Sequence, residues 1–88
     1  MGIYQTYEKY KRIRPEGLTR DEFERIQAQT DAFLDRYTHL RARTAIETDQ
    51  LQETAAAVTD LIAKGASDRS IEAAARERLR GTGLNGAL

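Results

Sequence analysis

The 88-residue chain contains no cysteine and no tryptophan, and it has one proline and one histidine, His39. Without cysteine the chain can form neither a disulfide framework nor a thiolate metal site. A single histidine argues against a histidine-rich metal site and against a relay of several histidines. The composition therefore predicts neither a bound metal nor a cofactor.

Long apolar runs are also missing. No stretch approaches the roughly 20 apolar residues of a membrane span, and the opening segment MGIYQTYEKYKRI lacks the apolar stretch of a signal peptide. The sequence therefore predicts no membrane association, and the cytosol or an intracellular assembly is the expected location.

The chain has no excess of charge of either sign, since 14 basic residues balance 14 acidic ones. This balance is weak support for non-specific nucleic-acid binding, which usually needs a basic surplus. The charge is less even locally, because residues 1–17 hold four basic and two acidic residues, whereas residues 18–38 hold three basic and five acidic ones. Opposed patches of this kind favour contacts with copies of the same chain or with a charged partner.

What the sequence does contain is apolar spacing typical of helices, and no segment alternates as a strand would. A short amphipathic helix is expected within residues 4–13, before Pro15 and Gly17 break it. Three main helices are expected at about 19–40, 49–64 and 68–80, with a loop between the first two. The predicted fold is all-α: one domain of residues 1–88, built as a small three-helix bundle with residues 81–88 as an extended tail. If Gly83 closes the last helix, Leu84 would instead contact Leu79, and residues 85–88 alone would form the tail.

Cap residues and apolar stripes define these helices. Thr19 and Glu22 form a capping box, Thr48 and Ser67 are the expected N-caps of the next two helices, and Gly65 is the expected glycine after the second. The expected core stripes are Phe23, Ile26, Thr30, Phe33, Leu34 and Tyr37 in the first helix, Leu51, Ala55, Val58 and Ile62 in the second, and Ile71, Ala74, Ala75 and Leu79 in the third.

No constellation in the sequence indicates an enzyme. The segment GTGLNG lacks the lysine of a phosphate-binding loop and follows a helix rather than a strand. Asp31 and Asp35 share a helix face, but we interpret that face as solvated rather than as an acid–base pair. His39 near a helix C-terminus is expected to interact with the helix dipole.

Two groups of residues are candidates for contacts with partners. Arg41, Arg43, Arg76 and Arg80 can touch phosphates or acidic partners, or they can simply be solvated. Tyr4 and Tyr7 can stack on bases, although tyrosines at this spacing more often pack in a core or an interface. These six residues are the candidates for contacts with a partner. One function compatible with these residues is that of a small helical regulator that binds nucleic acid through the arginines of the last helix, and we keep it as the alternative function.

Three stretches taken in order resemble the head–tail connector (adaptor, or head-completion) proteins of tailed bacteriophages. The first is a Y-x-x-Y element followed by a capped helix with E-F. The helix closes with Thr30, Asp31, Leu34, Asp35, Arg36, Thr38 and Arg41. The second is the alanine-rich stretch before Leu61, and the third is the ending RERLRGTGL. Two departures are the direct joining of the last two helices by Lys64–Asp68 and the ending NGAL, where the family often continues with aromatic and glycine residues.

The resemblance implies a small helical structural protein of the virion neck, without enzymatic activity, assembled in the host cytoplasm. Such proteins form a ring, usually of twelve copies, beneath the portal protein. The ring extends the DNA channel, lets DNA pass without sequence specificity, and offers a surface to the next neck component, the stopper. The six candidate residues named above would then face a neighbouring subunit or that channel.

The resemblance also implies a role for the apolar C-terminal tail, since C-terminal segments of the family commonly dock on the portal. In this chain Gly81, Gly83 and Gly86 would act as hinges, and Leu84 and Leu88, with Leu79 at the base of the tail, would act as anchors. We therefore predict a portal-binding tail that folds on binding.

Overall fold

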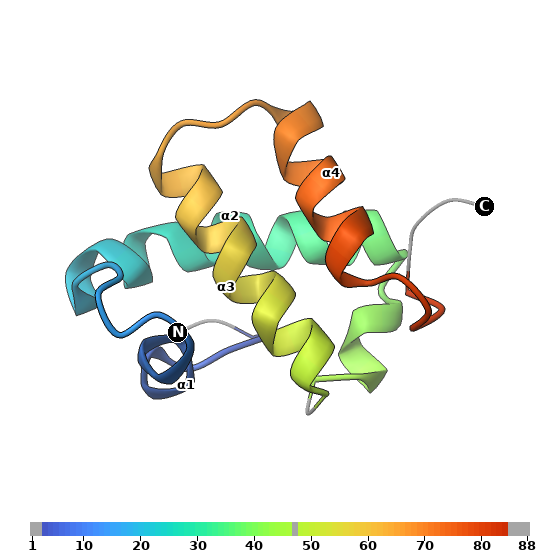
Figure 1. Ribbon diagram of the computed structural model, residues 1–88, viewed down its shortest axis with the longest axis horizontal. Coiled ribbons are helices and arrows are strands. Elements are labelled where there is room, and N and C mark those ends of the chain that lie inside the picture. Colours follow the sequence, from blue (N-terminus) through green and yellow to red (C-terminus); the bar gives the residue numbers. More distant parts are fainter. Residues whose placement is uncertain (1–2, 47, 85–88) are drawn as a thin grey trace.

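The computed structural model describes residues 3–46 and 48–84, and every regular element within these ranges is helical. The elements in chain order are α1 (Tyr7–Ile13), α2 (Arg20–Thr38), the short 3-10 helix η1 (Arg41–Thr44), α3 (Asp49–Ala63) and α4 (Asp68–Arg78). The predicted all-α character is therefore confirmed. Figure 1 shows α2 running across the molecule behind α3, with α1 near the start of the chain and α4 above the far end of α2.

Each α-helix begins where a hydroxyl side chain satisfies a backbone N–H of the first turn. The caps of α1, α2, α3 and α4 are Thr6, Thr19, Thr48 and Ser67. The capping box is complete, because Glu22 also accepts from the backbone N–H of Thr19 at 3.1 Å. The N-terminal boundaries of the three main helices therefore follow from local sequence.

The helix ends differ more from the prediction. After α3, Gly65 has a φ of 76°, and the N–H of Ala66 donates to the carbonyl of Leu61 at 3.0 Å. The left-handed glycine and this bond form a Schellman closure, which agrees with the prediction that Gly65 follows this helix. Helix α2 ends at Thr38 rather than at about residue 40, because the backbone turns left-handed at His39 (φ 54°) and Leu40 (φ 67°). Neither residue is the glycine that usually occupies this conformation.

Helix α3 lies at the centre of the fold and is buried on more than one side. Leu51, Ala55 and Val58 of the predicted stripe are fully buried, but Ile62 is only partly so. Other residues around the helix are buried as well, namely Gln52, Thr54, Ala56, Ala57 and Thr59. A single stripe is too narrow for this helix because α1, α2 and α4 all pack against it. Its small alanine and threonine side chains allow that close approach.

The core has two parts. The larger part gathers Tyr4, Leu34, Leu51 and Leu79 with other residues from α2, α3 and α4. The smaller part consists of Tyr10, Phe23 and Ala56, with Tyr7 and Leu18 packed against it. Phe23 touches both tyrosine rings, with centroid distances of 5.3 Å to Tyr7 and 5.0 Å to Tyr10. The short N-terminal helix is therefore fixed to α2 by aromatic contacts.

Two segments that were predicted to be irregular contribute to the core. The expected loop after α2 contains η1, whose Ala42 is fully buried. Helix α4 ends at Arg78 rather than Arg80, and the chain then turns through left-handed Gly81 and Gly83. Leu84, at 7% exposure, returns to the same core cluster as Leu79. Residues 81–84 thus pack on the helices rather than extending as the first part of a tail.

Candidate functional site

Two aspartates of α2, one turn apart, hold the start of the chain against that helix. Asp31 accepts the backbone N–H groups of Ile3 at 2.8 Å and Tyr4 at 3.4 Å. Asp35 accepts the hydroxyl of Tyr4 and binds the guanidinium of Arg43 at 2.9 and 3.2 Å. The prediction that Asp31 and Asp35 form a solvated face holds only in part, because both side chains are partly exposed but both carboxylates also accept hydrogen bonds from the start of the chain. We call Asp31, Asp35, Tyr4 and Arg43 the N-terminal joint.

The charges in the N-terminal joint stabilise one another. The hydrogen bonds and charge of Arg43 hold the pKa of Asp35 below its usual value, against the opposing effect of partial burial. Burial and the bond to Asp35 raise the pKa of the Tyr4 hydroxyl to about 12. The bond to Asp35 also raises the pKa of the Arg43 guanidinium. At neutral pH the joint is therefore an ionised carboxylate between a guanidinium and a neutral phenol, which is an arrangement that binds chain segments rather than transferring protons.

A buried polar network continues from the joint into the space between α2 and α3. The side-chain amide of Gln5 donates to the Thr59 hydroxyl at 2.9 Å and to the Gln27 carbonyl oxygen at 3.2 Å. Thr30 and Thr59 share a hydrogen bond at 3.0 Å. Gln52 of α3 donates to the backbone carbonyl of Tyr4 at 2.8 Å. These directional bonds fix the position of residues 4 and 5 between the two helices.

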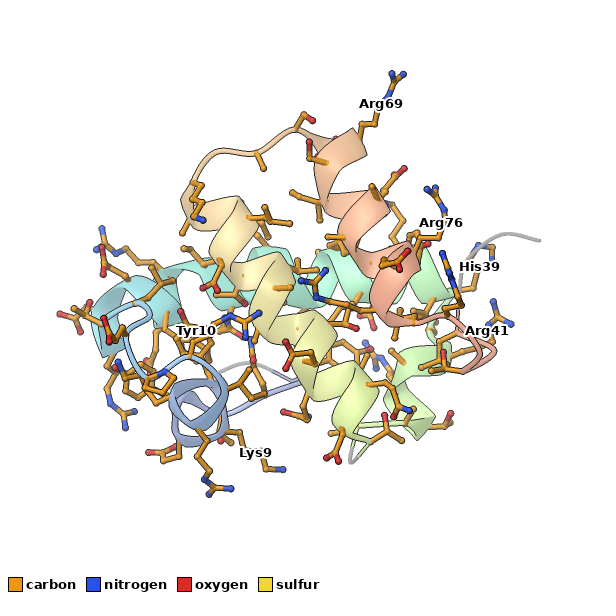
Figure 2. All side chains as sticks on the ribbon, in the orientation of Figure 1. Lys9, Tyr10, His39, Arg41, Arg69 and Arg76 are labelled. Carbon is orange, nitrogen blue, oxygen red and sulfur yellow. The ribbon has the colours of Figure 1, made fainter. Side chains whose placement is uncertain are left out.

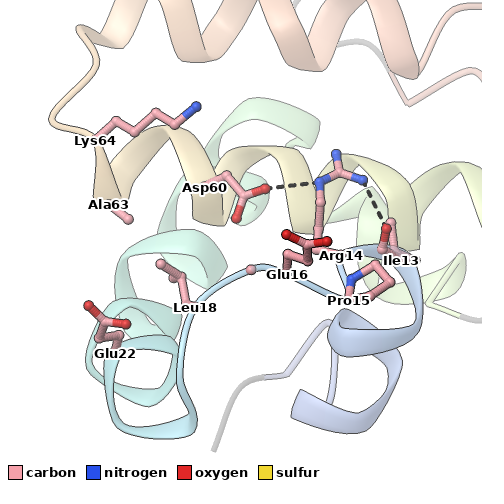
Figure 3. Close-up of a pocket in the computed structure, with 10 residues that line it drawn as sticks. Ile13, Arg14, Pro15, Glu16, Leu18, Glu22, Asp60, Ala63 and Lys64 are labelled. Carbon is pink, nitrogen blue, oxygen red and sulfur yellow. Dashed lines mark hydrogen bonds and ion pairs between the residues drawn. The ribbon is translucent and has the colours of Figure 1, made fainter.

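A cavity of about 620 Å³ lies at the other end of α2, between the α1–α2 connection and the end of α3 (Figure 3). Its wall carries the ion pair between Arg14 and Asp60, at 2.9 Å, and the apolar side chains of Leu18 and Ala63. Asp60 also accepts the Tyr10 hydroxyl at 2.7 Å, and burial together with this bond raises the pKa of Tyr10 to about 12. None of the lining residues supplies a thiol, a hydroxyl or an imidazole, so the cavity offers shape and charge for binding.

A second hollow of about 440 Å³ adjoins this cavity and shares Leu18, Glu22 and Ala63 with it. Arg25, Ile26 and Gln29 of α2 complete its wall. We call it the α2 N-terminal hollow. Its apolar lining residues are Leu18, Ile26 and Ala63, and Glu22 and Arg25 supply charge of both signs. Such a mixture suits an apolar side chain that is accompanied by charged neighbours.

The structure separates the six residues predicted to face a subunit or a channel. Tyr4 is fully buried in the chain's own core and offers no surface to a neighbour. Tyr7 is half-buried under the guanidinium of Arg20, 4.9 Å from its ring centroid. Arg43 is bound within the N-terminal joint, although part of its side chain is exposed. Tyr4, Tyr7 and Arg43 therefore serve the internal packing of the chain.

The other three arginines lie on the surface. Arg80 pairs with Glu77 at 2.8 Å, and Arg41 donates to the carbonyl of Thr38 at 3.0 Å. Arg41, Arg76 and His39 project toward the end of the molecule where α2 and α4 finish (Figure 2). The sequence leaves open whether these arginines are solvated or contact a partner, and it does not show that His39 and Arg76, far apart in the chain, project toward the same end of the molecule (Figure 2).

The predicted portal-binding tail is only partly within the described residues. Leu79 is fully buried and Leu84 nearly so, whereas Gly81 and Gly83 are exposed turn residues. Leu79 and Leu84 therefore anchor the C-terminal turn to the chain's own core. The two remaining residues, Gly86 and Leu88, lie outside the described residues.

Neither a metal site nor a membrane span is found in the described part of the chain. Across residues 3–46 and 48–84, no group of three or more His, Cys, Asp or Glu side chains is placed to hold a metal ion. Within the same ranges, no helix combines the length and the apolar character needed to cross a membrane. Comparison of the chain with protein-family models, with curated proteins and with solved structures gives no match.

Proposed function

We propose that this chain is a structural subunit of a bacteriophage neck, in which copies form a ring beneath the portal protein. The ring would extend the DNA channel, join head to tail, and present its lower face to the stopper. Twelve copies are expected, from the resemblance to connector proteins. The subunit would be made in the host cytoplasm and would act in the virion, without enzymatic activity.

The observation that carries this proposal is that the α2 residues on which the resemblance rests form hydrogen bonds and core contacts that hold the fold together. Thr30 lies in the buried network, Asp31 and Asp35 bind the start of the chain, and Thr38 accepts the N–H of Ala42 at 3.0 Å. Leu34 is fully buried between them. Side chains that bind distant parts of their own chain in this way build a rigid shape, and a rigid shape is what a structural ring subunit requires.

The portal-docking part of the proposal now rests on residues 85–88. Leu84 is part of the core, so a chain that leaves its own helices to dock on the portal would do so after Leu84. Leu88 is the proposed anchor and Gly86 the proposed hinge. Removal of residues 81–88 together would also remove Leu84 from the core, and a loss of binding could then reflect unfolding.

Co-purification with the portal protein encoded in the same genome tests the proposal. The full chain is compared with a variant ending at Leu84 and with a full-length Leu88→Ser variant. The full chain is expected to form a stoichiometric complex that both variants lose while keeping the melting temperature of the full chain. The matched control is Leu84→Ala, which is expected to lower the melting temperature and yet retain portal binding below that temperature.

Each result of this comparison has one meaning. A complex with all variants keeps the connector function and refutes docking through residues 85–88. No complex with the folded full chain refutes the connector function. In that case a duplex-binding titration at several salt concentrations tests the regulator alternative, since such a protein should bind with a steep salt dependence.

A further inference from the structure

Leu40 is unusual in two independent respects. It is 56% exposed, which makes it the more exposed of the two large hydrophobic residues on the described surface; the other is Ile3, at 48%. It also has a φ of 67°, in the left-handed region that a branched side chain rarely adopts. A glycine would fit this backbone better and a polar residue would suit the solvent better. The chain thus holds a leucine side chain outward at a cost in stability.

The surroundings of Leu40 are basic. Arg36 in the last turn of α2 and Arg41 at the start of η1 are both exposed, and His39 precedes Leu40. Arg76 of α4 projects toward the same end in Figure 2. We call Leu40 with Arg36, His39 and Arg41 the Leu40 knob.

The opposite end of α2 carries a complementary feature, the α2 N-terminal hollow. Leu18, Ile26 and Ala63 form its apolar part, and Glu22 lies on its wall. Asp21 and Glu24 lie on the same turns of the helix, where Arg25 accompanies them. Arg20 is already neutralised by Glu8 at 2.8 Å and Glu24 at 3.3 Å. Arg25 also lines the hollow, so Arg20 and Arg25 stand against the carboxylates of Asp21, Glu22 and Glu24, and these five side chains leave one negative charge over. The hollow therefore combines apolar lining residues with a small acidic excess.

The two features lie at opposite ends of one helix. Helix α2 has 19 residues, so its ends are separated by about 27 Å at a rise of about 1.5 Å per residue. The Leu40 knob therefore cannot reach the hollow of its own chain. It can reach the hollow of a second copy, and a contact between two different surfaces of identical chains generates a ring or a filament.

We propose that the Leu40 knob of one copy docks in the α2 N-terminal hollow of the next. Leu40 contacts Leu18, Ile26 and Ala63 of the neighbour, while Arg36 and Arg41 face the neighbour's Asp21 and Glu22. The contact is head-to-tail, so it repeats from copy to copy, and its closure as a ring is taken from the proposed function. This inference rests on the proposed function in one respect, because it names the surfaces that would join subunits of that ring.

Sedimentation velocity of the full chain over a range of concentrations tests the contact without any portal protein. Leu40→Gly removes the knob and relieves the left-handed backbone, so the variant should melt at a higher temperature than the wild type and associate at least about tenfold more weakly. Ala63 is exposed and lines the hollow, so the long side chain of Ala63→Arg fills it. The added positive charge also repels Arg36 and Arg41 of the docking copy, and the variant should therefore associate more weakly as well. The matched control is Ile3→Ser, which changes the other exposed hydrophobic residue and should associate as the wild type does.

A mixture of the two weakened variants gives the sharper test. Ala63→Arg retains an intact knob and Leu40→Gly retains an intact hollow, so one productive contact forms between them. The mixture should give a one-to-one dimer that grows no further. The inference is overturned if the wild type stays monomeric up to about 1 mM, the range of the weakest specific contacts. It is also overturned if Leu40→Gly associates like the wild type, or if the mixture stays monomeric.

Portal co-purification separates this inference from the proposed function. Association through Leu40 without any portal complex would keep the head-to-tail contact and refute the connector function. A full portal complex of Leu40→Gly in the wild-type stoichiometry would keep the connector function and refute the contact as the joint between ring subunits.

Discussion

Gly17 is the position where a single methyl group should have the largest effect for its size. The Cβ of an alanine at residue 17 would lie 2.8 Å from Cζ of the Tyr10 ring, closer still to the hydroxyl oxygen, and 3.0 Å from Cβ of Arg14. Tyr10 cannot easily move away. Its side chain is fully buried, and its hydroxyl both donates to Asp60 at 2.7 Å and accepts from the N–H of Leu18 at 2.8 Å.

The expected cost of Gly17→Ala combines two terms. Forcing a methyl group into a packed site costs about 1–3 kcal/mol, and weakening the two bonds of the Tyr10 hydroxyl costs about 1 kcal/mol more. The total of roughly 2–4 kcal/mol is a large part of the 4–13 kcal/mol expected for a chain of about this size. It corresponds to a fall in melting temperature of roughly 10–25 °C.

Thermal unfolding followed by circular dichroism measures this effect, and a double-mutant cycle assigns it to Tyr10. Because Tyr10→Phe removes the hydroxyl oxygen, Gly17→Ala should cost at least about 1 kcal/mol less in that background. The neighbouring exposed substitution Glu16→Ala is the control and should change stability by less than about 0.5 kcal/mol. A Gly17→Ala chain that melts within about 2 °C of the wild type would refute the close packing of Tyr10 on residue 17.

Three further predictions test the joint, the network and the C-terminal turn. Because the folded-state pKa of Asp35 lies below its ordinary value of 3.8, the ionised form stabilises the fold above that pH, and this stabilisation is lost as the pH falls through the lower folded value. Asp35→Asn should therefore be less stable than the wild type at pH 7 and should lose less stability between pH 7 and pH 2 in urea unfolding; equal pH profiles would contradict this. Thr59→Val leaves buried amide groups without their shared hydroxyl and should cost about 1–3 kcal/mol in urea unfolding, whereas a neutral effect would refute the network. Leu84→Ala should cost about 2–4 kcal/mol by the same measurement, and a cost below about 1 kcal/mol would place Leu84 outside the core.

The parts of the fold that could be predicted are those determined by neighbours in sequence. Thr19, Thr48 and Ser67 were identified as caps because a hydroxyl before an apolar stripe binds an N–H three residues later. Gly65 was identified as the end of α3 for the same kind of reason, because the Schellman closure spans only six residues. The helix starts and the all-α class follow from such short-range rules.

The parts that could not be predicted depend on partners far along the chain. Asp35 has no local feature that distinguishes it from a solvated carboxylate, because its partner Tyr4 is 31 residues earlier. Ala42 is a single small apolar residue and creates no apolar periodicity, so the sequence does not show that η1 packs against the core. The sequence allows Leu84 either to pack on Leu79 or to act as a free tail anchor among glycines. In the structure Gly81 and Gly83 form exposed turns, and Leu84 returns to the core cluster that contains Leu79.

The long separation between the first residues and their partners has a consequence for how the chain is made. Gln5 binds Thr59 and the carbonyl of Ala55, which are 54 and 50 residues away, and Gln52 binds the carbonyl of Tyr4 across 48 residues. During synthesis the N-terminus emerges first, yet its binding partners on α3 are translated more than halfway through the chain. Contacts between distant residues form slowly, because the entropy of closing a long loop must be lost before those contacts stabilise the chain. The first segment to leave the ribosome is therefore expected to be among the last to reach its native position.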